Sequence, residues 1–272
     1  MRDPQVPRAV FRSLHEAGCF VIPNPWDRGS ARYLESLGFK ALATTSSGFA
    51  WSTGRSDNHI TLDDALRHFQ DLTAWVDVPL NADFEHGFAA DPVGVAANVR
   101  RAVATGIAGV SIEDSTGDVA DPLFEFGLAV ERIHAASEAV KDSGVLLVAR
   151  SEGFIAGRPD LDETVRRLAA FAAAGADCLY APGIKTREQI SAVVRAVAPK
   201  PVNVLMSSDH LTVAELSALG VRRISVGGAL ARAAWQGFMS AAREIAERGT
   251  FHGLATAAPH AEVEGLFDRS RR

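Results

Sequence analysis

The sequence predicts an α/β protein, a (β/α)8 TIM barrel in a single domain. Short apolar runs alternate with amphipathic segments almost throughout the 272 residues, which is typical of parallel strands joined by helices. A glycine precedes many of the runs, at the position where it ends a helix. No Gly-rich dinucleotide loop follows the first run, which disfavours the alternative, an open doubly wound sheet.

Eight apolar runs fit the eight strands of such a barrel. They cover residues 20–22, 41–43, 80–82, 109–112, 145–149, 176–180, 202–205 and 223–226. Apolar residues at three- and four-residue spacing predict helices between them, over 29–37, 92–105, 126–141, 162–174, 187–197 and 213–219, and a long one over 229–248. We expect a barrel domain at 1–249 and a helical tail at 250–272 that packs on the barrel or on another subunit.

Composition excludes several classes of protein. The net charge of −5 gives no basic field for nucleic acid or an anionic membrane. No run approaches the roughly 20 apolar residues that span a bilayer, and residues 1–4 do not read as a signal peptide. We therefore expect a cytoplasmic protein in which Cys19 and Cys178 are buried thiols without a disulfide.

Carboxylates follow the third and fourth expected strands. Asp83 and Glu85 lie two positions apart, so an extended chain would turn both to the same face, and Glu113 ends the next run. Like charges held together are costly unless a cation lies among them. Oxygen ligands without clustered Cys or His favour Mg²⁺, with Mn²⁺ possible, over Zn²⁺. The alternative is that these carboxylates only cap the following helices.

Arg150 directly follows the fifth run, at the expected mouth of the barrel. A guanidinium there suits a carboxylate or phosphate, although an ion pair with Glu152 or Glu113 is the alternative role. Residues 44–48 are rich in hydroxyls and backbone N–H groups that could cradle an oxyanion, or could form an ordinary polar turn. The candidate substrate-binding residues in this stretch are Thr45, Ser46 and Ser47.

Three further residues complete the expected mouth. Trp26 follows the first strand and Asn203 belongs to the seventh, and both are candidates for substrate binding. Asp57 lies in the loop after the second strand. Acidic residues, one arginine and an oxyanion cradle are the parts needed to hold a small di-anionic acid and to stabilise an enolate.

Several motifs together resemble the isocitrate lyase / phosphoenolpyruvate mutase superfamily, over roughly residues 8–250. The segments that carry the resemblance are 81–88 (NADFEHGF), 109–114 (GVSIED) and 148–155 (VARSEGFI), supported by 38–41, 45–48, 174–177 and 220–225. The resemblance implies a modified barrel, a bound Mg²⁺, small 2-oxo or 2-hydroxy acids as substrates, and C–C or P–C chemistry through enolate-like intermediates. It also implies a homodimer or homotetramer that exchanges a C-terminal helix.

The same resemblance implies roles for individual residues. Asp83 and Glu85 match the metal-binding Asp-x-Asp motif, with Glu replacing the second Asp, and Glu113 matches the glutamate of the fourth strand. Asp57 matches a catalytic loop aspartate and Arg150 the substrate-binding arginine. We therefore expect Arg150, Asp57 and Glu113 to be catalytic, and Asp83, Glu85 and Glu113 to hold the metal.

The loop after Glu113 departs from the family. Isocitrate and methylisocitrate lyases carry a Lys-Arg-Cys-Gly motif there, and phosphonomutases carry a Lys and an Asn-rich stretch. Residues 114–122 read DSTGDVADP and have neither. The sequence therefore favours a Mg²⁺-dependent lyase that cleaves or decarboxylates a small dicarboxylic acid. The alternatives are P–C chemistry of the phosphonomutase or phosphonopyruvate hydrolase type, and a non-catalytic protein that binds 2-oxo acids.

Overall fold

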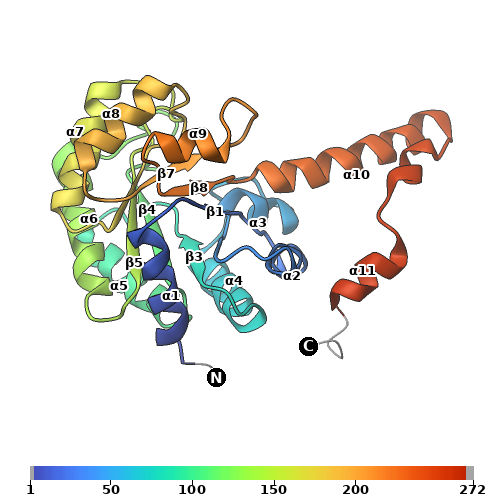
Figure 1. Ribbon diagram of the computed structural model, residues 1–272, viewed down its shortest axis with the longest axis horizontal. Helices are drawn as coiled ribbons and strands as arrows, with labels where there is room; N and C mark the ends of the chain where they lie inside the picture. Colours follow the sequence, from blue (N-terminus) through green and yellow to red (C-terminus); the bar gives the residue numbers. More distant parts are fainter. Residues whose placement is uncertain (1–2, 268–272) are drawn as a thin grey trace.

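Eight parallel strands form the predicted barrel in the computed structural model, which describes residues 3–267 (Figure 1). The strands are β1 (Phe20–Ile22), β2 (Leu42–Ala43), β3 (Leu80–Asp83), β4 (Gly109–Glu113), β5 (Leu146–Arg150), β6 (Cys178–Tyr180), β7 (Val202–Leu205) and β8 (Arg223–Ser225). Each agrees with its predicted run to within two residues at either end. The fold prediction is therefore confirmed.

The hydrogen-bonded order runs β1-β8-β7-β6-β5-β4-β3-β2. Strands β1 and β2 share no ladder, but single bonds close the ring between them. The Ala43 amide donates to the Pro23 carbonyl at 3.1 Å, and the Asn24 side chain donates to the Thr44 carbonyl at 2.9 Å. The carboxyl ends of all eight strands therefore surround one mouth.

Helices join the strands, precede the first strand and follow the last. They are α1 (Gln5–Glu16), α2 (Arg28–Ser36), α3 (Ser46–Ser52), α4 (Leu62–Trp75), α5 (Pro92–Val103), α6 (Phe126–Val140), α7 (Leu161–Ala173), α8 (Arg187–Val197), α9 (Val213–Ala218), α10 (Ala229–Arg248) and α11 (His260–Phe267), with a 3₁₀ turn at His252–Thr256. Thr61, Thr186 and Thr212 begin three of them as capping boxes. The predicted helices are present, whereas α1, α3 and α4 were not foreseen.

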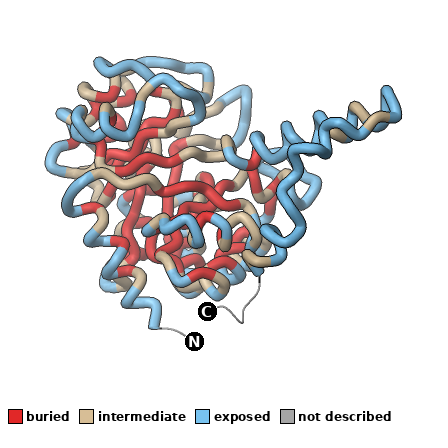
Figure 2. Tube along the Cα trace, turned by 45° about the vertical axis from the view of Figure 1, so that its right-hand side comes forward, coloured by how far each residue is buried: buried red, intermediate tan, exposed pale blue. Residues whose placement is uncertain are grey.

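Helix α1 closes the end of the barrel opposite the mouth. Phe11 is fully buried there, and Arg8 donates to the carbonyls of Val103, Ile107 and Ser143 at 2.8–3.0 Å. These carbonyls follow α5 and α6, so the guanidinium satisfies groups that those helix ends leave free. In Figure 2 the buried residues concentrate in the strands and on the inner sides of the helices.

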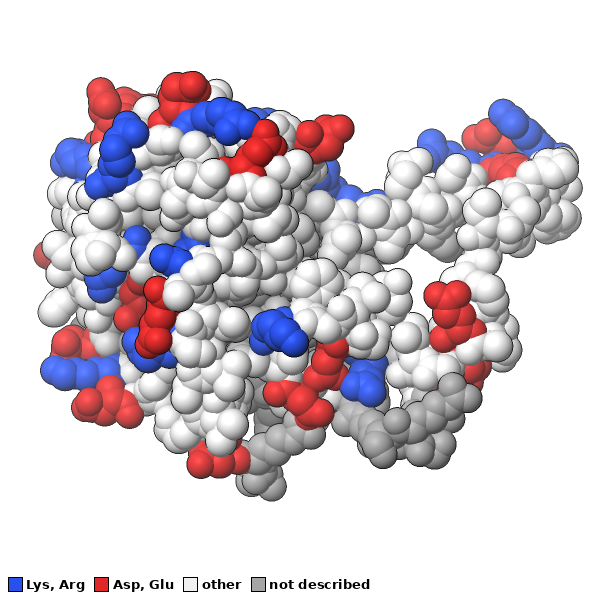
Figure 3. All heavy atoms as spheres, in the orientation of Figure 1, with Lys and Arg blue, Asp and Glu red and all other residues white. Residues whose placement is uncertain are grey.

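The C-terminal elements leave the barrel as an arm. Helix α10 projects away from the barrel, and α11 returns toward it and packs on α2 (Figures 1 and 2). The Phe267 ring comes close to Gly29 there. Large apolar side chains are exposed along this arm: Trp235, Phe238, Met239, Ile245, Phe251, Leu254 and Val263. Charged groups gather toward the far end of α10 in Figure 3. The basic end of the tail, residues 268–272, lies outside the described residues, and among the described ones no helix has the length and apolarity of a membrane span.

Candidate active site at the carboxyl ends of the strands

One guanidinium holds three carboxylates together at the mouth. From the end of β5, Arg150 contacts Asp83 Oδ1 through Nη1 at 2.7 Å and Glu113 Oε2 through Nη2 at 3.1 Å. Its Nε contacts Glu152 Oε1 at 2.8 Å. Burial alone would lower the pKa of Arg150, but the three carboxylates outweigh it and hold the pKa above its usual value. One positive charge thus faces three acidic groups.

Asp83 is also fixed from the other side, by the start of α3. Its Oδ2 accepts hydrogen bonds from the backbone N–H and the hydroxyl of Ser46 at 2.9 and 3.0 Å. Its own amide donates to Thr44 Oγ1 at 2.8 Å. Bonds of this kind to an ionised carboxylate are among the stronger hydrogen bonds in proteins. Asp83 is therefore held in one orientation before any ligand arrives.

The hydroxyl-rich stretch forms the N-cap and the first turn of helix α3, rather than the ordinary polar turn that was the alternative to an oxyanion cradle. Thr45 is the N-cap of α3, with its Oγ1 3.1 Å from Ser47 Oγ and 3.4 Å from the Gly48 amide. A Cβ on Gly48 would lie 2.7 Å from Thr45 Cγ2 and 3.0 Å from Trp26 Cβ, so only glycine allows this approach. Trp26 thus packs on the turn that carries Thr45, Ser46 and Ser47.

Glu85 reaches the cluster by a different route from the predicted one. Strand β3 ends at Asp83, so alternation along a strand does not orient Glu85. Instead it lies in a turn with φ of +48°, a left-handed conformation that costs a non-glycine residue roughly 1–3 kcal/mol. The turn is tied to β4, because the Glu85 carbonyl accepts the Glu113 amide at 3.0 Å. Strain of this kind is common where a side chain is held for function.

The carboxyl groups around Arg150 are hard to ionise together. Burial, followed by repulsion from Asp83 and Asp57, raises the pKa of Glu85 to about 8. Burial also raises the pKa of Glu113, against the opposing effect of Arg150. Although Asp57 is exposed as a residue, desolvation of its carboxyl and the charge of Asp83 raise its pKa as well. The mouth therefore favours bound protons or a bound cation.

The donor set fits a hard divalent cation held largely by water. Oε1 of Glu85 is buried without a hydrogen-bond partner, so it is available as a ligand. In the described part of the chain, no three Asp, Glu, His or Cys side chains are arranged to hold one ion directly. Mg²⁺ commonly takes one or two protein carboxylates and keeps several waters. We infer that Asp83 and Glu85 would be the direct ligands and that Glu113 would act through water.

The raised pKa of Glu85 predicts a pH-dependent cost to folding. In chelator-containing buffer, the native state binds a proton that the unfolded chain releases, so stability falls as the pH rises from about 4.5 to 8. Glu85→Gln removes this cost, so at pH 8.5 its free energy of unfolding should exceed that of the wild type by up to about 5 kcal/mol, and it should melt at a higher temperature. Near pH 4.5 the two should melt alike. Thermal melts across this range test it, with exposed Glu131→Gln as control, and parallel wild-type and Glu85→Gln curves would contradict it.

The other predicted residues lie at different depths. Asp57 belongs to the loop between α3 and α4. Its charge raises the pKa of Glu85, and the charge of Asp83 raises the pKa of Asp57, so the three carboxyl groups lie close together. Asn203 lies inside β7, is fully buried and pairs in register with Tyr180, the neighbour of Arg150. It donates to Ser225 Oγ at 2.9 Å, while its Oδ1 has no hydrogen-bond partner.

Two residues of the cluster were not among the predicted site residues, although the sequence had indicated Glu152 as a possible ion-pair partner of Arg150. Glu152 is almost fully buried and binds Arg150 Nε, and the Tyr180 ring lies under the Arg150 guanidinium at 5.3 Å. The signal for Glu152 was available, because it follows Arg150 by two positions and so faces the same side. The signal for Tyr180 was its place at the end of β6.

Comparison with known proteins identifies the family of this chain. Residues 11–246 match the family model of phosphoenolpyruvate phosphomutase. The chain belongs to this family. An oxaloacetate decarboxylase of Paraburkholderia xenovorans is 31% identical over 82% of this chain and 75% of its own.

Solved structures extend the family comparison to the whole fold. One from Burkholderia cenocepacia J2315, described as a lyase/mutase, is 47% identical with a TM-score of 0.94 and covers 97% of this chain and 98% of its own. Oxaloacetate acetylhydrolase in complex with its product oxalate is 25% identical, with a TM-score of 0.86 over 99% of this chain and 96% of its own. The family and these neighbours therefore confirm the resemblance to the phosphoenolpyruvate mutase / isocitrate lyase superfamily.

Proposed function

We propose that this member of the superfamily is a Mg²⁺-dependent lyase that cleaves or decarboxylates a small 2-oxo or 2-hydroxy dicarboxylic acid. The observation that carries the proposal is the Arg150 cluster, in which a buried guanidinium and several acidic groups share one mouth. Relatives that act on oxaloacetate support the substrate class. A cytoplasmic location is consistent with this chemistry and is part of the proposal.

Each residue has a defined part in this reaction. Arg150 uses three of its five N–H groups on carboxylates of the protein, so two remain for a carboxylate of the substrate. Thr45 and Ser47 offer hydroxyls for an oxygen of the substrate, on the same turn whose Ser46 binds Asp83. Asp57, on its loop, is a candidate for proton transfer at the open side of the site. Breaking the C–C bond leaves negative charge on the 2-oxo fragment, which the Arg150 side of the mouth stabilises.

A divalent cation held by Asp83 and Glu85 would supply further positive charge for that enolate. P–C chemistry in the same mouth is the second candidate, supported by the phosphomutase family model. Against it, residues 114–122 contain no lysine or asparagine that could contact a phosphonate.

A turnover screen with Mg²⁺ tests the proposal. We expect release of product from oxaloacetate or a related dicarboxylate, and very little glyoxylate or succinate from isocitrate. The loop after Glu113 offers only hydroxyls and carboxylates, and hydroxyls are poor acids at neutral pH. Cys178 cannot replace the missing loop cysteine, because burial raises its pKa to about 11 inside the barrel. Isocitrate turnover near the enzyme median of about 10 per second would contradict this reading, and tight oxoacid binding without any turnover would indicate a binding protein.

We also propose that the C-terminal arm mediates a homodimer or homotetramer by exchange of its helix. The exposed apolar side chains of α10, including Trp235 and Phe238, would be costly to leave in water. Trp235→Glu/Phe238→Glu should shift the protein to monomer in sedimentation equilibrium, because each charge would be buried at the interface. The control is Arg243→Glu on the same helix. A wild-type monomer at micromolar concentration would contradict the proposal.

A further inference from the structure

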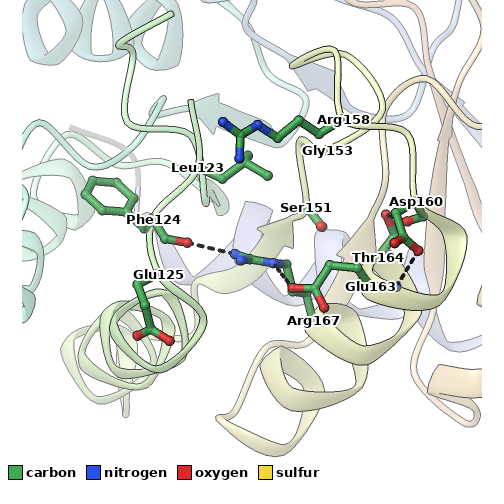
Figure 4. A pocket seen from close by; sticks show the side chains of 10 residues that line it. All are labelled: Leu123, Phe124, Glu125, Ser151, Gly153, Arg158, Asp160, Glu163, Thr164 and Arg167. Atoms are coloured by element: carbon green, nitrogen blue, oxygen red, sulfur yellow. Dashed lines mark hydrogen bonds and ion pairs between the residues drawn. The ribbon is translucent and has the colours of Figure 1, made fainter. Parts of the chain in front are cut away.

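A cavity of about 300 Å³ lies outside the barrel mouth, between the loop after β4, the loop after β5 and the start of α7 (Figure 4). Ser151 forms part of its wall. Because side chains alternate along an extended chain, Ser151 faces away from the mouth, whereas its neighbours Arg150 and Glu152 face into it. The volume is at the lower end of the range for small-molecule sites. Gly153, which has no side chain, keeps the space open beside Leu123.

Donor groups with spare hydrogen-bonding capacity line this cavity. Among residues 3–267, the Arg158 side chain has no ion pair and no hydrogen bond. Its guanidinium extends across the cavity in Figure 4. Arg167 uses Nε and Nη1 on Glu163, Asp114 and the Phe124 carbonyl, which leaves its Nη2 free. The Ser151 hydroxyl has no partner of standard geometry and only weakly assists Asp114.

The acidic residues on the rim are already engaged. Asp160 accepts the Glu163 amide at 3.0 Å as the N-cap of α7. Both oxygens of Glu163 bind Arg166, and one also binds Arg167. Glu125 accepts the amides at the start of α6 and points away from the cavity in Figure 4. Glu163 is thus fully paired and Glu125 points away, which leaves one oxygen of Asp160 as the unpaired acceptor among the described rim residues, opposite the free donors.

We propose that this cavity binds a small oxyanion, either phosphate or a short dicarboxylate, between Arg158, Arg167 and Ser151. Two guanidiniums are the usual recognition groups for such oxygens, because their N–H forks match carboxylate and phosphate geometry. Leu123 and Phe124 exclude water from one side and strengthen each charged hydrogen bond. This site is additional to the substrate site of the proposed function.

A continuous set of bonds connects the cavity to Arg150. Arg167 Nη1 lies 3.2 Å from Asp114 Oδ2, and Asp114 Oδ1 accepts the Glu152 amide at 2.8 Å. Glu152 in turn binds Arg150 Nε at 2.8 Å. An anion that draws Arg167 toward itself competes with Asp114 for that guanidinium. Occupancy of the cavity therefore alters the support of Arg150 and also restrains the loop at 114–125.

Calorimetric titration with inorganic phosphate, and separately with malonate, tests the site in metal-free buffer. We expect saturable binding of at least one anion to the wild type. Arg158→Gln should weaken it by about tenfold or more, the loss expected for a charge-assisted hydrogen bond. Exposed Arg100→Gln is the matched control and should bind as the wild type does. Phosphate binding alone identifies a phosphate ligand, and malonate binding alone identifies a dicarboxylate.

The active-site variant Arg150→Gln separates this site from the substrate site. It should retain saturable anion binding, with a smaller change in affinity than Arg158→Gln shows, because it acts on the cavity only through Glu152 and Asp114. Hydrogen exchange of residues 114–125 should slow with anion in the wild type but not in Arg158→Gln. Absence of saturable binding to the wild type, equal affinity in Arg158→Gln, or loss in Arg150→Gln would each overturn the site. Unchanged exchange in the occupied wild type would overturn the coupling. None of these measurements depends on turnover.

Discussion

Arg150→Lys should lower kcat/KM on the true substrate by a hundredfold or more while the protein remains folded. The guanidinium contacts three carboxylates through three different nitrogens. A lysine ammonium keeps the charge but is a point donor on a flexible stem, so it cannot bridge Asp83, Glu113 and Glu152 and still bind a substrate. Loss of two charge-assisted hydrogen bonds corresponds to about 3 kcal/mol or more. Steady-state kinetics on the substrate found by the turnover screen measures the effect.

The control for Arg150→Lys is Arg166→Lys. Arg166 also pairs with a glutamate, but it lies on the outer surface of α7, where ion pairs contribute little. Arg166→Lys should leave both kcat and KM unchanged. Thermal melts separate folding from function. Lysine keeps a positive charge among the buried carboxylates, so Arg150→Lys should lose only part of the stability that the guanidinium provides. Wild-type kinetics in Arg150→Lys would mean that the Arg150 guanidinium neither positions the carboxylates of the site nor binds the substrate.

The barrel was predictable because its signals are local and repeated. Each strand of a parallel barrel is buried on both faces, so it appears as a short apolar run, and each helix shows its own periodicity. Helix α3 lacked such a signal, since it has seven residues and follows directly from β2. Helix α1 precedes the first strand, outside the strand–helix alternation, although its apolar Phe11 is fully buried.

The sequence could predict which residues gather at the mouth, but not all of their conformations and contacts. The ends of parallel strands converge in any barrel, so Asp83, Glu113 and Arg150 could be grouped from sequence. The conformation of Glu85 could not be inferred, because a positive φ at a non-glycine residue depends on tertiary contacts such as its bond to the Glu113 amide. The contact of Ser46 with Asp83 could not be inferred either, because it joins residues 37 positions apart.

The cation site leads to the second large expected effect. Asp83→Asn keeps the size of the side chain but removes the charge that Arg150 and Ser46 hold in place. We expect loss of Mg²⁺-dependent turnover by about a thousandfold or more, roughly 4 kcal/mol of transition-state stabilisation. Titration with Mn²⁺ followed by electron paramagnetic resonance should show weaker metal binding without any assay of activity. Exposed Asp71→Asn is the control and should match the wild type in both measurements.

Asp83→Asn should also change the titration of its neighbour. After burial, repulsion from Asp83 is the largest cause of the raised pKa of Glu85, so its removal should bring that pKa down toward the ordinary value. In metal-free buffer, the loss of stability between pH 4.5 and 8 should then be smaller in Asp83→Asn than in the wild type. Unchanged Mn²⁺ affinity together with an unchanged pH dependence would place the cation elsewhere. Weaker Mn²⁺ binding with a shallower pH dependence would tie the metal, Asp83 and Glu85 to one site, because a single negative charge then accounts for both effects.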